Sequence, residues 1–362
     1  MQADELTIKM AEFSITGWTD IRVTRGIERL PSDFSIGLTE LFPREVEKLF
    51  INPGAACEVL LGKDVVINGY VDHFIPSMSA GEHSIRVSGR SKCSDLVDCA
   101  AEWPGSQFSN ATVLGIAQRL ASIYGTPTNG VAPGIPVTTN VKDLPIIPQA
   151  NLMLGESPFD IIERLARFSA VLVYDLADGS LFLSRVGTRS AASGFAEGVN
   201  VESAYVDYSA DQIYSDYNVY IQSLDVFFDI GSGGNLLTNV QDVNCKRHRA
   251  KVIISEASGK GNDTAMQRGL WESARRSGRS RVVKVVTDSW RDASGALWEP
   301  NTLVPVSLPR LKMDATLLIS EVTFLRNDRG TTAELTLMAP EAFIPEPVNL
   351  NRIWSDVPQV SQ

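Results

Sequence analysis

The sequence predicts a mainly β protein with an α+β insertion: two similar antiparallel β-barrels and a small α/β module between them. Three observations indicate this fold class. Apolar and polar residues alternate with period two toward both ends of the chain, helical spacing is confined to the middle and one later stretch, and one strand–turn–strand pattern occurs twice. Because single cores stop growing at ~250 to 300 residues, a chain of 362 residues predicts two or three domains.

The first predicted domain is a β-barrel over residues 1–100. Its strands are indicated by alternating apolar side chains at Ile21 and Val23, at 34–38, at 57–61, and at Ile85 and Val87. Turn residues, such as Asn-Pro-Gly at 52–54, separate these runs. Several short, half-buried strands of this kind are typical of an antiparallel sheet or barrel.

The second predicted domain is an α/β module over residues 101–190 that contains two helices. Apolar residues with helical spacing mark the first helix: Val113, Ala117, Leu120 and Tyr124. We expect Asn110 as its N-cap and Gly125 as its stop. Ser157 and Pro158 are an N-cap and a first-turn proline, so they predict the start of a second helix.

The remainder of the module is predicted as loop and hairpin. Residues 126–149 are rich in Pro and Gly and predict a long loop. The apolar runs at 170–174 and 181–184 flank Asp178-Gly179, a favoured hairpin turn, and therefore predict two strands.

The third predicted domain is a second β-barrel over residues 191–345. Alternating strands are expected near 217–221, 282–286, 317–324 and 335–337. One helix is inserted near 263–278, and we expect its stripe of Met266, Leu270 and Ala274 to pack on the barrel. Residues 346–362 carry prolines and no periodic pattern, which predicts an extended C-terminal arm.

An internal repeat supports the two-barrel layout. Residues 53–59 align with 300–306 at an offset of 247 (300 minus 53). Further on, Val71 aligns with Val322 at 251 (322 minus 71), and Val87 aligns with Leu337 at 250 (337 minus 87). Identity is low, so a chance alignment of two β patterns is the alternative. If the repeat is real, three chains would present six similar units.

Composition and charge exclude several classes of function. The formal charge is -10, from 33 Lys+Arg and 43 Asp+Glu, which argues against a nucleic acid or an anionic membrane as the main partner. The apolar runs are shorter than the ~20 residues of a membrane span, and the first ten residues do not resemble a signal peptide. We therefore expect a protein made in a cytoplasm, with its four cysteines reduced.

Motifs for catalysis, metals or cofactors are not found. The sequence contains none of the common hydrolase, zinc, phosphate-binding or calcium motifs. The adjacent Asp72 and His73 point to opposite faces of a predicted strand, so they do not form an orienting pair. Glu156, Asp160 and Glu163 could suggest glycosidase chemistry, but acids at a helix start favour a capping role. We predict no catalytic residue, no metal and no cofactor.

The candidate site residues are therefore interface residues. A basic cluster spans the helix near 263–278 and the strand that follows it, and it could contact DNA or an acidic protein surface. Trp290 and Trp298 flank a turn and are expected at a barrel end or a subunit contact. The candidates are Arg268, Trp271, Arg275, Arg276, Trp290 and Trp298.

Several separate blocks of the chain resemble, in order, the baseplate hub family of bacteriophage Mu and its relatives. They are residues 17–19, 23–28, 68–72, 87–92, 95–101, 288–291, 295–301 and 339–343. The resemblance covers nearly all of residues 15–345. The loop at 126–149 and the tail depart from the family pattern.

The resemblance implies a structural hub of a contractile phage tail, similar to the base of type VI secretion spikes. It implies a homotrimer with pseudo-sixfold symmetry that joins a hexameric tail tube to a trimeric spike, among other baseplate proteins. DNA would only pass through its channel, and the virion baseplate would be assembled in the host cytoplasm. The alternative is a tail-associated cell-wall hydrolase, which would need Glu156, or Asp72 with His73, to be active.

Overall fold

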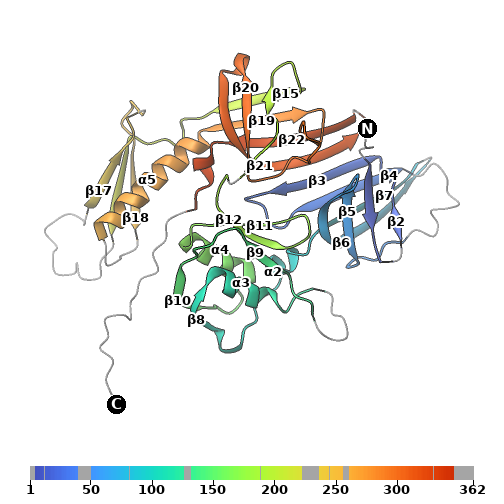
Figure 1. Ribbon diagram of the computed structural model, residues 1–362, viewed down its shortest axis with the longest axis horizontal. Coiled ribbons are helices and arrows are strands. Elements are labelled where there is room, and N and C mark those ends of the chain that lie inside the picture. The colour runs from blue at the N-terminus through green and yellow to red at the C-terminus, as the bar shows by residue number, and fades with distance from the viewer. Residues whose placement is uncertain are drawn as a thin grey trace.

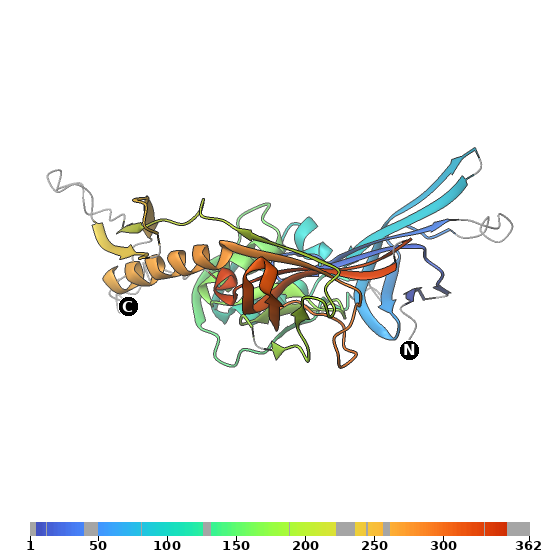
Figure 2. The ribbon, with the colours of Figure 1, turned by 90° about the horizontal axis from the view of Figure 1, so that it is seen from above.

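The computed structural model describes residues 5–11, 13–39, 50–80, 82–125, 132–187, 189–221, 236–243, 245–255, 261–328 and 330–345. The described part of the chain is mainly β, as predicted, and most strands belong to one 14-stranded sheet (Figures 1 and 2). An α/β module packs beside the middle of this sheet, and a small unit built on one long helix lies at the end opposite the first strands (Figure 1).

The sheet has two halves. The first is built from β1 (Leu6–Lys9), β2 (Ser14–Ile15), β3 (Asp20–Gly26), β4 (Asp33–Thr39), β5 (Ala56–Leu61), β6 (Asp64–Ser79) and β7 (Glu82–Ser91). The second is built from β13 (Arg189–Ser190), β14 (Phe195–Ala196), β15 (Ser203–Tyr208), β19 (Arg281–Thr287), β20 (Thr302–Leu308), β21 (Met313–Asn327) and β22 (Gly330–Met338).

The two halves are joined edge to edge. The strand order is β15-β19-β22-β21-β3-β4-β7-β6-β5-β1-β2, with β20 paired to β21, and with β13 and β14 paired to β20. Because β21 and β3 pair antiparallel, the halves that we expected as separate barrels share one continuous sheet.

The internal repeat is visible in the strand register. The hairpins β6–β7 and β21–β22 have the same bulge, since the register shifts between Val71 and His73 in one and between Ile319 and Glu321 in the other, and the distance from the bulge to the turn is the same in both. The offset is 248 positions (319 minus 71). The sequence-based offsets of 251 and 250 for this hairpin are wrong, because short alternating patterns of low identity do not determine a register.

The turn that precedes each hairpin unit also repeats, at the predicted offset of 247 (301 minus 54). Gly54 and Asn301 both have left-handed backbones, with φ of 86° and 60°. The Gly54 N–H donates to the Val71 carbonyl at 2.7 Å, and the Asn301 N–H donates to the Ile319 carbonyl at 2.9 Å. Equivalent backbone hydrogen bonds therefore hold the two turns against equivalent positions of β6 and β21.

The equivalence extends over five strands. In the first half the spatial order is β3-β4-β7-β6-β5, and in the second half it is β15-β19-β22-β21-β20. Short turns in one half are long insertions in the other: six residues join β3 to β4, whereas residues 209–280 separate β15 from β19.

One hydrophobic core lies under both halves. It includes side chains from each half, among them Phe34, Val59, Trp290 and Phe324, all of which have an exposed fraction of 0%. Burial of each such side chain contributes roughly 1.5–3 kcal/mol, so the shared core stabilises the two halves as one body.

The α/β module has its own core. Its elements are α2 (Ser94–Asp98), a 3-10 turn η1 (Pro104–Ser106), β8 (Gln107–Thr112), α3 (Val113–Ala121), β9 (Val137–Thr139), β10 (Ile146–Asn151), α4 (Pro158–Phe168), β11 (Leu172–Asp175) and β12 (Leu181–Ser184). The predicted hairpin around Asp178-Gly179 is confirmed as β11–β12.

Two predictions for the module need correction. The N-cap of α3 is Thr112, whose Oγ1 accepts the Gly115 N–H at 3.2 Å, whereas Asn110 lies in β8. The loop predicted at 126–149 contains β9 and β10, because β10 pairs with β8 and β9 pairs with β12. Residues 126–131 lie outside the described residues.

The start of the second helix is confirmed. Ser157 and Asp160 form a reciprocal capping box on α4, with the Asp160 N–H donating to Ser157 Oγ at 3.1 Å and the Ser157 N–H donating to Asp160 Oδ2 at 3.0 Å.

The inserted helix belongs to a separate unit. Helix α5 (Gly261–Arg279) packs on a three-stranded sheet of β16 (Asp216–Ile221), β17 (Leu236–Gln241) and β18 (Ala250–Ser255), with its own small core. The strand that we expected near 217–221 in the second barrel is therefore in this smaller sheet. Two further 3-10 turns are η3 (Pro309–Leu311) and η4 (Pro340–Phe343).

The face of α5 that packs on this sheet is not the predicted one. Met266 and Leu270 have exposed fractions of 43% and 53%, whereas Ala265 and Gly269 are buried. A Cβ at position 269 would lie 2.7 Å from Val240 Cγ2, so a small residue lets the helix approach the sheet closely. The domain boundaries stay predictions, and the arm at 346–362 lies outside the described residues.

Candidate functional site

The acids considered for glycosidase chemistry are occupied by structural contacts. Glu156 pairs with the Arg164 guanidinium and accepts the Met153 N–H at 2.9 Å, and the Arg164 contact lowers the pKa of Glu156. The hydrogen bond from Ser157 likewise lowers the pKa of Asp160. Because a general acid needs a raised pKa, both carboxylates have the opposite property.

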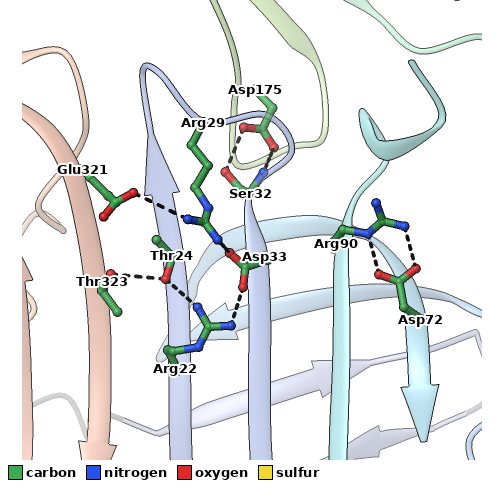
Figure 3. A network of polar contacts seen from close by, with 10 residues as sticks. All are labelled: Arg22, Thr24, Arg29, Ser32, Asp33, Asp72, Arg90, Asp175, Glu321 and Thr323. Carbon is green, nitrogen blue, oxygen red and sulfur yellow. Dashed lines mark hydrogen bonds and ion pairs between the residues drawn. The ribbon is translucent and has the colours of Figure 1, made fainter. Parts of the chain in front are cut away.

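Asp72, from the Asp72–His73 pair, also makes a structural contact. Asp72 is the residue at the bulge of β6, and its carboxylate accepts a hydrogen bond from Arg90 Nε at 2.7 Å (Figure 3). Among the residues that the structure describes, no group of three His, Cys, Asp or Glu side chains could hold a metal ion. None of the described helices is long and apolar enough to cross a membrane.

The basic cluster on α5 is largely paired within the chain. Arg275 lies 3.6 Å from Glu28, in the turn between β3 and β4, and Arg279 also pairs with Glu28. Arg276 pairs with Glu272 at 2.7 Å, and the side chain of Glu272 is only 11% exposed. Arg275 and Arg279 therefore hold α5 against the large sheet, and Arg276 pairs within the helix itself.

Arg268 and Trp271 lie next to Arg275 on α5. The Arg268 guanidinium stacks over the Trp271 ring at 4.8 Å, and Arg275 lies over the same ring at 5.4 Å. Trp271 Nε1 donates to the Ile344 carbonyl at 2.7 Å. The predicted interface role of these residues stays a prediction.

Trp290 and Trp298 are not surface residues, which corrects the expectation of a subunit contact. Their exposed fractions are 0% and 2%. Trp290 Nε1 donates to the carbonyls of Leu325 and Thr332, at 3.0 Å and 2.9 Å, and Trp298 Nε1 donates to Ser289. Both side chains are instead part of the hydrophobic core that the two halves share.

The described residues that join the two halves form what we call the internal seam: the pairing of Glu321 to Arg326 in β21 with Ile21 to Gly26 in β3. Figure 3 shows its polar side chains. Thr24 and Thr323 share a hydrogen bond of 3.2 Å across the seam, and Arg29 lies 3.6 Å from Glu321.

The same region anchors the module. The buried Asp175 carboxylate, from the end of β11, accepts the Ser32 N–H at 3.0 Å and the Ser32 hydroxyl at 2.8 Å (Figure 3). Sequence reasoning missed the seam and this anchor, because single Thr, Ser and Asp residues form no motif. The signal that could have found the seam was the repeat, since β3 and β15 occupy equivalent positions.

These features define a class of protein: a scaffold in which a duplicated strand unit, with insertions, forms one continuous sheet. Residues 5–91 match the family described as Mu phage baseplate assembly protein GpP-like, N-terminal. Residues 93–185 match the second domain of the baseplate hub protein gp44-like family, and residues 261–346 match the fourth domain of Mu phage baseplate assembly protein GpP.

Similar whole proteins agree. The baseplate hub protein gp44 of Escherichia phage Mu is 27% identical over 356 residues, which cover 97% of this chain and 91% of that protein. The 43 kDa tail protein of prophage MuSo2 from Shewanella oneidensis is 30% identical, with a TM-score of 0.81 over 95% of this chain and 100% of that chain. A tail protein from Neisseria meningitidis MC58 shares the fold, with 18% identity and a TM-score of 0.76 over 95% of this chain and 99% of that chain.

The chain belongs to the Mu-like baseplate hub family. It is a structural protein of the phage tail baseplate and not an enzyme, so the hydrolase alternative is set aside.

Proposed function

We propose that three copies of this chain form a pseudo-sixfold ring that joins the hexameric tail tube to the trimeric spike. The observation that carries the proposal is the duplication of five strands, with the same bulge and the same fastened turn in each unit. Two similar units per chain match a sixfold partner when three chains close into a ring, and closed cyclic symmetry is how soluble oligomers usually satisfy such contacts.

The partners that follow are the tail tube protein, the central spike protein and other baseplate proteins. Two surfaces are available for them on α5: the stacked Arg268 and Trp271, and the partly exposed Arg275 and Arg276. Because the last two already pair with Glu28 and Glu272, we assign them first to holding α5 in place and only secondly to a partner.

DNA would pass through the ring without binding. Strong phosphate binding requires free Lys and Arg side chains along the path. The formal charge of -10 and the pairing of the α5 arginines with acids both support a channel that does not retain DNA. We further propose that the ring is assembled in the host cytoplasm, and we assign no membrane partner and no cofactor.

Mass measurement in solution tests the proposal. Light scattering coupled to gel filtration should give three times the 39.5 kDa chain mass at micromolar concentration, and electron micrographs should show rings with six similar units. A stable monomer or dimer that does not change when the spike protein is added would refute the ring.

A further inference from the structure

Two strand edges of the large sheet are unpaired within the described residues. The second half of β6, from His73 onward, pairs with β7 on one side only, and β15 pairs only with β19. The β6–β7 hairpin extends away from the body of the molecule (Figure 2). Unpaired edges of this length are templates for pairing with another strand.

The repeat relates these two edges to the internal seam. At the hairpin offset of 248, the half of β21 that pairs with β3 corresponds to the unpaired half of β6. In the same way, β15 corresponds to β3, because Val23 and Val206 face equivalent strands, β4 and β19, at equivalent positions. Each chain therefore holds one paired and one unpaired copy of the same edge-to-edge contact.

We propose that the unpaired half of β6 pairs antiparallel with β15 of a second copy of this chain, in the register of the internal seam. This proposal rests on the proposed homotrimer and names its contact. The register places Phe74 opposite Tyr208, Ile75 opposite Asp207, Pro76 opposite Val206, Ser77 opposite Tyr205 and Met78 opposite Ala204. We call this contact the outer seam.

Three copies close such a contact into a ring. Each copy contributes one β6 edge and one β15 edge, so the contact is head to tail, and head-to-tail contacts give rings when the rotation closes. Three internal seams would then alternate with three outer seams, which makes six similar joints.

The side chains on both edges fit this pairing. Large hydrophobic side chains are exposed on each edge: Ile75 at 50% and Met78 at 85% on β6, and Tyr205 at 53% and Tyr208 at 51% on β15. In the internal seam the equivalent core-facing pair, Phe324 and Val23, is fully buried. Met78 and Tyr208 lie on the face that corresponds to this buried pair, and Ile75 and Tyr205 lie on the opposite face. Pairing would therefore cover exposed apolar area on both faces of the sheet, and this supports a second copy as the occupant.

Pro76 distinguishes the outer seam from the internal one. The Ile27 N–H donates to the Ser320 carbonyl at 2.9 Å, so in the alternating ladder Val322, Phe324 and Arg326 turn their backbone groups toward β3. Pro76 corresponds to Phe324 and has no N–H. The outer seam therefore has one backbone donor fewer, and an isolated chain is protected from unspecific strand addition.

Disulfide trapping tests the register. In the double variant Ser77→Cys with Tyr205→Cys, the two positions face each other across the outer seam as a pair that is not hydrogen-bonded, with Cα atoms ~4.5 Å apart. Within one chain they are separated by the strand order β15-β19-β22-β21-β3-β4-β7-β6, at ~4.8 Å per strand, which is far beyond disulfide reach. Mild oxidation should yield covalent dimers and trimers on a non-reducing gel.

The matched control is Ser77→Cys with Ala204→Cys, which shifts one partner by one residue and places the two sulfurs on opposite faces of the sheet. It should give less than a tenth of the cross-linked product, as should the wild-type chain with its native cysteines. A light-scattering trimer in which the two double variants cross-link equally would overturn the outer seam and leave the proposed ring standing. A chain that stays monomeric in light scattering would overturn both.

Discussion

The hairpins β6–β7 and β21–β22 are the same structural unit in two different surroundings. They share their bulge and the distance from the bulge to the turn, yet the edge of β21 is paired with β3, whereas the equivalent edge of β6 is not paired with any described strand. Phe324 is accordingly buried in the core, while Pro76, at the equivalent position, is exposed. The comparison teaches that duplication supplies one edge for joining the halves and leaves a second, similar edge for another chain.

The insertions differ in the same way. A six-residue turn joins β3 to β4, but residues 209–280, with α5, stand between β15 and β19. Glu28 in the short turn pairs with Arg275 and Arg279 of α5, so the turn of one half fastens the insertion of the other. The two halves are alike in their strands and complementary in their connections.

The largest effect is expected for the edge of β21, which is buried by its pairing with β3. Phe324→Ala should lower the free energy of unfolding by ~3–5 kcal/mol, because it removes a fully buried ring from the shared core. Denaturant unfolding followed by tryptophan fluorescence measures this, since Trp290 lies 6.3 Å from Phe324. The control is Met78→Ala on the other hairpin, which should change the value by less than ~0.5 kcal/mol at a concentration where the chain is monomeric. Equal losses would break the comparison.

A smaller effect is expected at the insertion. Arg276→Ala should cost ~1–3 kcal/mol, because it leaves the largely buried Glu272 carboxylate without its cation. Arg310→Ala is the matched control: Arg310 is 89% exposed in its pair with Glu197 and should cost at most ~0.5 kcal/mol. Thermal unfolding compares the two. Similar melting temperatures would mean that α5 is not held by its own arginines.

Charge at position 75 should tune the outer seam without affecting the fold. Ile75 would face Asp207 of another copy, so Ile75→Asp should weaken the trimer and Ile75→Lys should strengthen it relative to Ile75→Asn, by ~0.2–1 kcal/mol per seam. Sedimentation equilibrium gives the association constants. Adding Asp207→Lys should restore the trimer of Ile75→Asp. If the association constants did not depend on the charge at position 75, Ile75 and Asp207 would not face each other.

The smallest effect concerns the module, which has no counterpart in either half. Ser157 lowers the pKa of Asp160 below its ordinary value of 3.8, so Asp160 stabilises α4 at neutral pH, and this stability is lost as the pH falls below 3.8 through the folded-state value. Asp160→Asn should therefore be less stable than the wild type at pH 7, with the difference closing as the pH falls below 3.8. Circular dichroism melts across this range measure it, and a constant difference would contradict the assignment.

Local patterns were good guides where a few adjacent residues decide the structure. Ser157, Pro158 and Asp160 carry a complete helix start, and Asp178-Gly179 carries a hairpin turn, because these conformations depend on neighbouring backbone groups. The prediction of Asn110 as the N-cap was wrong, because Thr112, two residues later at the end of the strand, also has a side-chain oxygen that can accept a backbone N–H. The stripe of Met266 and Leu270 misled because the small residues Ala265 and Gly269 permit the closer packing.

The sequence by itself determined the mainly β class, two of the three helices of the module and the family, since each is written in periodicity or in blocks of residues. It indicated the duplicated strand unit but not the register of its hairpin. Only the tertiary structure decided that the two halves form one sheet, that Trp290 and Trp298 are core residues, and that the α5 arginines pair with Glu28 and Glu272. The physical reason is that strand pairing and ion pairs join residues far apart in the chain, through backbone groups that every residue carries and through charges that have many possible partners.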